Sequence, residues 1–327
     1  MPLLSGHGAA LAHVGPPPAP ERLWATWSWD PSVLLGLVIV AFAYTRGLRQ
    51  LWRRAGTGRG VAVWRADLFM AGLATLFVAL VSPLDGLSSA LFSAHMVQHL
   101  LLILVVAPLL VLGKPSMALL WALPLPQRRA LGRVAQRAAL HTCRRALNRP
   151  WLAWLLAAIV LWVWHLPLLY EAALRHQFIH FLEHLCLLGS SLLFWEVLID
   201  RSGSRQFGYG FALAYIFAMA VQSTALGIIL TFSHPWYTAY AATTGAWELS
   251  PQDDQQIAGL IMWIPASAIY LIAGLTLIVT WFRVEERETR SHEGLSKEAC
   301  SAQRTAKFET HVVLGGVTNG VGRGLSH

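Results

Sequence analysis

Long apolar stretches separated by short polar segments run through most of the chain. Seven of these stretches approach the roughly 20 residues that an α-helix needs to cross a bilayer. They cover, to within a few residues, 32–52, 65–82, 92–113, 151–170, 177–199, 209–232 and 256–282. The pattern predicts an all-α fold, a polytopic membrane helix bundle with seven transmembrane helices.

The positions of the basic residues predict the orientation of these helices. Seven spans place 23 of the 25 Lys and Arg residues on one side of the membrane, and Arg22 and Arg175 on the other. Cytoplasmic segments of membrane proteins are enriched in Lys and Arg. We therefore expect an N-terminus outside the cytoplasm and a cytoplasmic C-terminus.

Composition agrees with a membrane protein. Hydrophobic residues make up 55% of the chain and charged residues 13%, about half the charged share of a soluble domain. We expect an extracytoplasmic tail over 1–30, a membrane domain over 31–285 with a basic cytoplasmic loop over 114–150, and a disordered cytoplasmic tail over 286–327. Residues 126–147 have the pattern of a basic amphipathic helix, lying on the inner leaflet or linking two spans in solvent.

Several classes of site find no support in the sequence. The three cysteines form no C-x-x-C pair, so neither a disulfide framework nor a thiolate metal site is expected. The N-terminus lacks the basic n-region of a cleavable signal peptide. There is no Gly-rich phosphate loop and no soluble enzyme domain, and we expect no nucleic-acid partner.

Histidines instead gather in the apolar segments at helical spacing. "FSAHMVQHLL" (92–101) places two of them four residues apart, and "LRHQFIHFLEHLCLL" (174–188) places three. In the predicted topology seven of the 13 histidines lie in or beside the outer ends of four spans: His95, His99, His165, His176, His180, His184 and His234. Residues four apart share one helix face. His99 and His184 would both lie about 10 Å below the outer boundary, as a site shared by spans three and five requires.

Metal binding is the function that this pattern favours. Ionisable groups are costly inside a membrane and are usually functional there, and a His pair at i, i+4 gives two ligands from one helix. Imidazole suits copper, zinc and iron. Glu183 would ligate the ion or accept an imidazole N–H, and the second role is favoured slightly. Met96 and Met262 would shift the preference towards Cu(I), although packing is the simpler role for both.

Single histidines have simpler explanations. His165 and His234, each taken alone, fit an interhelical hydrogen-bonding role better than a ligand role. His234 also precedes a proline at the end of a span, where it can be interfacial, and His176 can lie in water. These three residues therefore depend on the tertiary structure for their assignment.

Three motifs resemble the polytopic CtaG family of cytochrome c oxidase assembly factors. They are "SPLDGLSSALFSAHMVQHLLLILVVAPLLVLGKP" (82–115), "RPWLAWLLAAIVLWVWHLPLLYEAALRHQFIHFLEHLCLLGSSLLFW" (149–195) and "LSPQDDQQIAGLIMWIP" (249–265), and the likeness extends over about residues 30–285. The resemblance implies a multi-pass protein of the inner (plasma) membrane that binds copper and helps to metallate a haem–copper oxidase. It implies a metal chaperone and not an enzyme. Its motif residues in this chain are His95, His99, His165, His180, Glu183, His184, Asp254 and Met262.

The same resemblance suggests partners, and two other functions stay open. Cytochrome c oxidase subunits, a periplasmic copper carrier and membrane lipid are the expected partners. One alternative is a b-type haem protein with His99 and His184 as axial ligands. The other is an intramembrane zinc hydrolase, because "HFLEH" (180–184) has the H-x-x-E-H pattern in which Glu is a general base.

The predicted outer loop over 234–256 also admits two interpretations. Its charged residues are Glu248, Asp253 and Asp254, all acidic, among several Trp and Tyr residues. The loop is either a surface or re-entrant segment held by aromatic anchors, or a cover over the histidines that concentrates cations.

Overall fold

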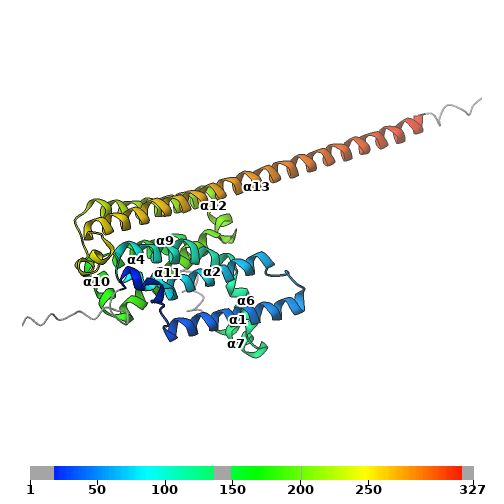
Figure 1. Ribbon diagram of the computed structural model, residues 1–327. Coiled ribbons are helices and arrows are strands. Elements are labelled where there is room, and N and C mark those ends of the chain that lie inside the picture. Colours follow the sequence, from blue (N-terminus) through cyan, green and yellow to red (C-terminus); the bar gives the residue numbers. More distant parts are fainter. Residues whose placement is uncertain (1–17, 136–148, 200, 319–327) are drawn as a thin grey trace, which may run out of the picture. The chain divides into compact units, whose positions relative to one another are not determined.

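A computed structural model describes residues 18–135, 149–199 and 201–318, and within these residues the regular elements are all helices (Figure 1). The longer ones are α1 (Pro31–Ala55), α2 (Val63–Val81), α9 (Pro150–Trp164), α11 (Gln177–Ile199), α12 (Arg201–Phe232) and α13 (Pro251–Thr318). The chain is thus an all-α, polytopic membrane protein, as the hydrophobic pattern predicts.

Short elements complete the bundle. They are η1 (Pro20–Ala25), α3 (Pro83–Ser88), α4 (Phe92–Leu100), the π-helix η2 (Leu101–Val106), α5 (Ala107–Leu112), α6 (Pro115–Ala122), α7 (Leu125–Ala135), α10 (Pro167–Arg175), η3 (Thr238–Ala242) and η4 (Thr244–Trp247). The consecutive elements α4, η2 and α5 form one span over Phe92–Leu112. The predicted amphipathic helix over 126–147 coincides with α7 at its start, and its remainder, 136–148, lies outside the described residues.

The predicted fourth span is not one straight helix. Six helices in the described chain are long and apolar enough to cross a membrane, and a seventh span exists if α9 and α10, which are bent by 72°, count as one. The break follows from Pro167, because proline pushes the preceding Leu166 out of the helical region (ψ 132°) and is itself favoured at the first position of a new helix. His165 therefore lies at the bend, not inside a helix.

Two compact units divide the chain, residues 1–274 and 275–327. In the second unit α13 continues to Thr318, whereas the sequence predicted disorder from about 286. The segment 283–318 contains no proline and is rich in Glu, Arg, Lys and Ala, which have high helix propensity. Disorder was expected because the tail after Arg290 contains several Gly and Ser residues and shows no clear hydrophobic periodicity.

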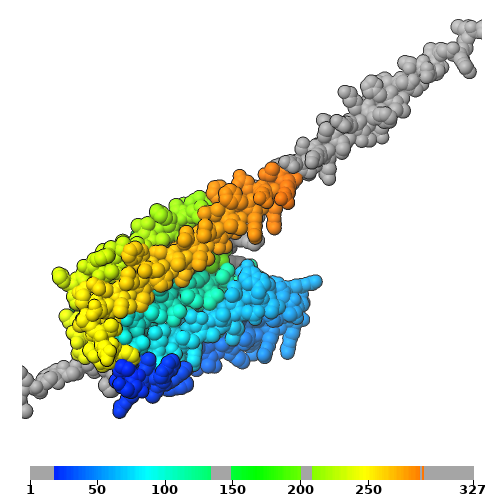
Figure 2. Space-filling model, turned by 45° about the horizontal axis from the view of Figure 1, so that its top comes forward, coloured from blue at the N-terminus to red at the C-terminus, as the bar shows by residue number. Residues whose placement is uncertain are grey.

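The loop between α12 and α13 covers one end of the first unit. In Figure 2 these residues, coloured yellow, lie beside the dark blue N-terminal segment, and Trp247 Nε1 donates a hydrogen bond to the Pro18 carbonyl at 3.2 Å. Below the loop, α12 and α13 cross closely at Gly227 and Gly259. A Cβ on Gly227 would lie 2.9 Å from the Gly259 carbonyl oxygen, so small residues are required there.

Candidate metal centre

Two helices bring five ionisable side chains together. His95 and His99 project from successive turns of α4, and His180, Glu183 and His184 project from α11. All five are buried, with at most 9% of each exposed. The ring centroids of His95 and His180 are 5.3 Å apart, and those of His99 and His184 are 5.4 Å apart. We call these five residues the histidine cluster; it has the arrangement between spans three and five that the spacing predicts.

The ligand atoms of the histidine cluster lie close enough to hold an ion. Two sets of three ligand atoms each lie within 4.8 Å of one another. One set comes from His95, His180 and His184, and the other from His95, His99 and Glu183. Two such triads sharing His95 have the donor types and spacing of a nitrogen- and oxygen-rich metal site.

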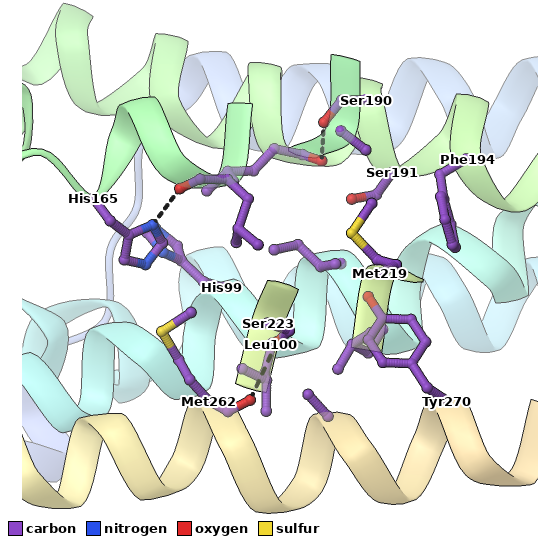
Figure 3. Close-up of a pocket in the computed structure, with 16 residues that line it drawn as sticks. His99, Leu100, His165, Ser190, Ser191, Phe194, Met219, Ser223, Met262 and Tyr270 are labelled. Atoms are coloured by element: carbon purple, nitrogen blue, oxygen red, sulfur yellow. Dashed lines mark hydrogen bonds between the residues drawn. The ribbon is translucent and has the colours of Figure 1, made fainter. Parts of the chain in front are cut away.

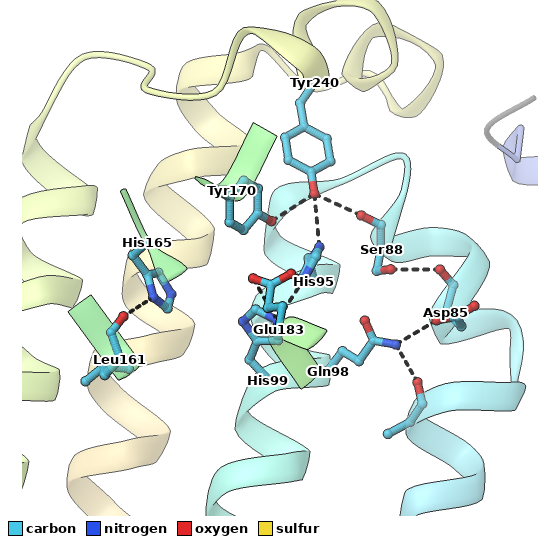
Figure 4. A network of polar contacts seen from close by, with 11 residues as sticks. Asp85, Ser88, His95, Gln98, His99, Leu161, His165, Tyr170, Glu183 and Tyr240 are labelled. Carbon is cyan, nitrogen blue, oxygen red and sulfur yellow. Dashed lines mark hydrogen bonds and ion pairs between the residues drawn. The ribbon is translucent and has the colours of Figure 1, made fainter. Parts of the chain in front are cut away.

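Glu183 lies in the middle of the cluster. Its Oε1 is 3.6 Å from His99 Nε2 and its Oε2 is 3.8 Å from His95 Nε2, and the side chain is fully buried (Figure 4). Neither oxygen has a hydrogen-bond partner among the described residues. The sequence slightly favoured a supporting role, but the carboxylate faces the same Nε2 atoms that would bind an ion. This position favours Glu183 as a ligand.

A tyrosine from the covering loop orients His95. Tyr240 Oη donates to the Ser88 carbonyl at 3.0 Å and lies 2.9 Å from Tyr170 Oη and 3.3 Å from His95 Nδ1. Because its own proton goes to Ser88, the Tyr240 oxygen accepts from His95 Nδ1–H. His95 then keeps the lone pair of Nε2 on the side of the cluster. Burial raises the pKa of Tyr240 well above its usual value, so the phenol stays protonated.

Asp254 is a helix cap and does not point at the cluster. Its carboxylate accepts from Phe92 N at 2.6 Å, from Ser93 N at 3.1 Å and from Ser93 Oγ at 2.5 Å. These bonds satisfy amides at the start of α4, where a negative charge is also favourable. The resemblance suggested Asp254 as a site residue; the structure makes it the residue that fixes where α4, and hence its histidine pair, begins.

A second polar network holds the neighbouring face of α4. Gln98 Nε2 donates to the Ala79 carbonyl at 2.7 Å and to Asp85 Oδ1 at 2.9 Å, and Ser28 Oγ donates to Asp85 Oδ2. The network ties α2, α3 and α4 together beside His99. Sequence reasoning missed Asp85 and Gln98, although polar residues within the motif 82–115 were a usable signal, and it gave Tyr240 an interfacial role only.

The remaining candidate residues divide into two groups. His165 and Met262 are buried and line a pocket beside His99. Met96 does not line this pocket and is fully buried in the apolar cluster that also contains Phe92 and Met262. His176 follows α10 and His234 follows α12, and both are exposed. Only His165 and Met262 of these residues therefore extend the site.

The pocket lies next to the histidine cluster and has a cavity volume of about 40 Å³ (Figure 3). Its walls come from η2 and from α9, α11, α12 and α13. Trp195 Nε1 of α11 donates at 2.9 Å to the carbonyl of Ile103 in the π-helix, and Pro108, five residues further on, has no N–H to offer that carbonyl. Single π-helical turns are often found at functional sites.

The helical bundle and the histidine cluster define the class: a polytopic membrane protein with a buried histidine–carboxylate centre. Residues 42–284 match the family described as cytochrome c oxidase caa3 assembly factor (Caa3_CtaG). This match covers well over half of the sequence, and the chain belongs to that family. The whole histidine cluster, His165 and Met262 fall within the matched region.

Three mycobacterial proteins, each named as uncharacterized, are similar to this chain. Mb0105 of Mycobacterium bovis and MT0111 of Mycobacterium tuberculosis are 26% identical to it over 277 residues, and ML1998 of Mycobacterium leprae is 25% identical over 291 residues. Each match covers 83% of this chain but 42% of the relative, so the chain spans less than half the length of these relatives. No solved structure is significantly similar to it.

Proposed function

We propose that this protein binds copper in the histidine cluster and delivers it during assembly of a haem–copper cytochrome c oxidase. The observation that carries the proposal is the pair of buried triads from α4 and α11, whose ligand atoms lie within 4.8 Å of one another. Family membership supplies the oxidase as the client. Delivery of a metal ion requires no catalysed reaction, which agrees with the description of the family as an assembly factor.

The donor atoms support copper over harder cations. Four imidazoles and one carboxylate suit copper, zinc or iron, whereas calcium and magnesium require mostly oxygen ligands. Copper is the ion in this group that a haem–copper oxidase must receive. The thioether of Met262 in the adjacent pocket adds a softer donor that copper(I) accepts.

Charge supports a monovalent ion. A net charge buried in a membrane protein is costly, and neutral imidazoles add none. Glu183 is the acid of the histidine cluster, with both oxygens near the imidazole nitrogens. One copper(I) ion would balance this carboxylate, so a loaded cluster would carry no net charge.

Haem is less well supported by the same geometry. The rings of His99 and His184 are perpendicular, with centroids 5.4 Å apart, and the rings of His95 and His180 pack against the same pair. A porphyrin between His99 and His184 would have to displace these neighbours. The zinc hydrolase is also disfavoured, because Glu183 lies against two imidazoles of α4 and not beside an open space for a water molecule.

The outer loop covers the histidine cluster through Tyr240, but its acids are poorly placed to attract cations. Asp254 caps α4, and Asp253 accepts from Ser250 Oγ at 2.6 Å and from Ser250 N at 3.4 Å at the start of α13. Two of the three acids thus have structural roles. We propose that an ion enters from this side, outside the cytoplasm in the predicted orientation, where a periplasmic copper carrier would reach it.

Metal analysis of the full chain, purified in detergent and equilibrated with copper(I), tests the function. The wild-type protein should retain copper without a haem Soret band, and His184→Ala, which lacks a ligand of the histidine cluster, should retain clearly less. His234→Ala is the matched control, because this exposed histidine lies outside the cluster, and it should load like wild type. A Soret band, or equal copper in wild type and His184→Ala, would reject the proposal.

A further inference from the structure

We propose a second, inner site for a soft monovalent cation, formed by His99 Nδ1, His165 Nε2 and Met262 Sδ where the pocket meets the histidine cluster. This inference rests on the proposed function, since it adds a second copper(I) position next to the first. It is distinct from the triads of the cluster, which use neither His165 nor Met262.

His165 offers a lone pair to the pocket. Its Nδ1 lies 2.7 Å from the Leu161 carbonyl, which can only accept, so the ring proton is on Nδ1. Nε2 therefore carries the lone pair, in a side chain that is 1% exposed. This nitrogen has no hydrogen-bond partner among the described residues. A backbone carbonyl that fixes the tautomer in this way is common behind metal-binding histidines.

His99 offers a second lone pair through a chain of hydrogen bonds. Tyr240 takes the Nδ1 proton of His95, so His95 Nε2 must accept in its 2.8 Å contact with His99 Nε2. His99 is then protonated on Nε2 and has its lone pair on Nδ1. That nitrogen is also buried without a hydrogen-bond partner in the part of the chain that the structure describes.

Met262 completes a soft donor set. It is 3% exposed, lines the same pocket, and in Figure 3 its side chain extends from α13 towards the rings of His99 and His165. The two rings are 6.0 Å apart between centroids and nearly perpendicular. Two imidazole nitrogens and a thioether form a set that prefers copper(I) over zinc or a hard cation.

The ligands allow both sites to be filled together, and the second ion then adds one positive charge that the single carboxylate, Glu183, does not balance. An outer ion on His95, His180 and His184 leaves His99 available for the inner ion. The Nε2–H of His99, which then loses His95 as acceptor, can turn to Glu183 Oε1, now 3.6 Å away. An ion that moves inwards thus leaves the ligands of the outer triad and binds to the inner set, of which His99 lies nearest to the outer triad.

The test compares two conservative substitutions in the pocket. Met262→Leu removes the proposed sulfur ligand, and Met219→Leu removes the other methionine of the same pocket; Leu and Met have similar volumes, so both variants should fold. Copper(I) is titrated into each full-length protein under reducing conditions against a chelator, with silver(I) as a redox-silent probe. X-ray absorption reports whether sulfur is bound.

Wild type and Met219→Leu should bind about two ions per chain with sulfur in the coordination shell. Met262→Leu should bind the second ion at least about tenfold more weakly and lose the sulfur signal. A wild-type protein that binds one ion, dependent on His184 and with nitrogen and oxygen ligands alone, would overturn the inner site and leave the proposed function standing. A wild-type protein that binds no copper would overturn both.

Discussion

The histidine cluster and the contact between α1 and α6 stabilise the same bundle in opposite ways. Beside the α1–α6 contact, a buried polar group of α1 is paired: Tyr44 stacks on Phe69 of α2 at 3.7 Å between ring centroids and donates its hydroxyl at 2.9 Å to the carbonyl of Gly113, which lies just before α6. In the cluster, both oxygens of Glu183 lack a hydrogen-bond partner among the described residues. Buried polar groups are nearly always paired in folded proteins. The difference supports the proposed ligand-binding role of the cluster and a packing role for the α1–α6 contact.

Close packing is what the α1–α6 contact contributes. A Cβ on Gly47 would lie 1.8 Å from the Ala118 carbonyl oxygen, so the two helix backbones touch at this glycine. Lipid provides little hydrophobic drive between helices, and such close approach is a main source of their association. Folding stability should therefore be sensitive to added side-chain volume at the α1–α6 contact. Copper affinity should be sensitive to the loss of charge in the histidine cluster.

Replacing the buried acid should have the largest effect on binding. Glu183→Gln keeps the shape of the side chain but removes the charge and one ligand oxygen. We expect copper(I) affinity to fall roughly 100-fold, at the upper end of what loss of one such group costs a metal site. Competition with a chromogenic chelator measures the affinity.

Glu196→Gln is the matched control for this prediction, because Glu196 is an exposed residue of the same helix α11. It should bind copper like wild type. If Glu183→Gln and Glu196→Gln bind copper equally well, the carboxylate is not part of the site and the contrast between the two regions disappears.

Adding one methyl group at the α1–α6 contact should damage stability and leave binding intact. Gly47→Ala should lower the free energy of unfolding in detergent by about 1–3 kcal/mol, because the neighbouring backbone must move. Gly36→Ala, on the same helix with nothing within 4 Å of the added Cβ, should change stability little. Thermal unfolding and copper titration of both variants test this. A large loss of copper affinity in folded Gly47→Ala would contradict the separation of roles.

Loss of the α4 cap should give the smallest effect and sharpen the role of Asp254. Asp254→Ala should cost about 1 kcal/mol of stability, as is typical for an N-cap, and weaken copper binding slightly by loosening the start of α4. If Asp254 instead attracts cations, the same substitution should slow copper uptake, make the rate of uptake depend less on salt, and leave stability unchanged. Unfolding and uptake rates measured at two salt concentrations separate the two roles.

Spacing within single helices was enough to predict half of the candidate site. His95 and His99, and His180 and His184, must share a face of their helices because four residues nearly complete one turn. The spans could be predicted for the same reason, since their length and apolar character are local properties. Pro167, which breaks the fourth span, is also visible locally, but the apolar run across it favoured a continuous helix.

Contacts between distant segments decided the rest. The sequence does not show that Asp254 caps a helix that begins at Phe92, or that Tyr240 orients His95, because these pairs are joined across 162 and 145 positions of the chain. The sequence also did not decide whether Glu183 is a ligand or a hydrogen-bond acceptor for an imidazole. It did not show which residues His165 contacts. A ligand role requires lone pairs to converge on one point, and that depends on how helices pack against one another. The sequence by itself therefore determined the class of protein and the residues of the cluster, while the tertiary structure decided which atoms face an ion.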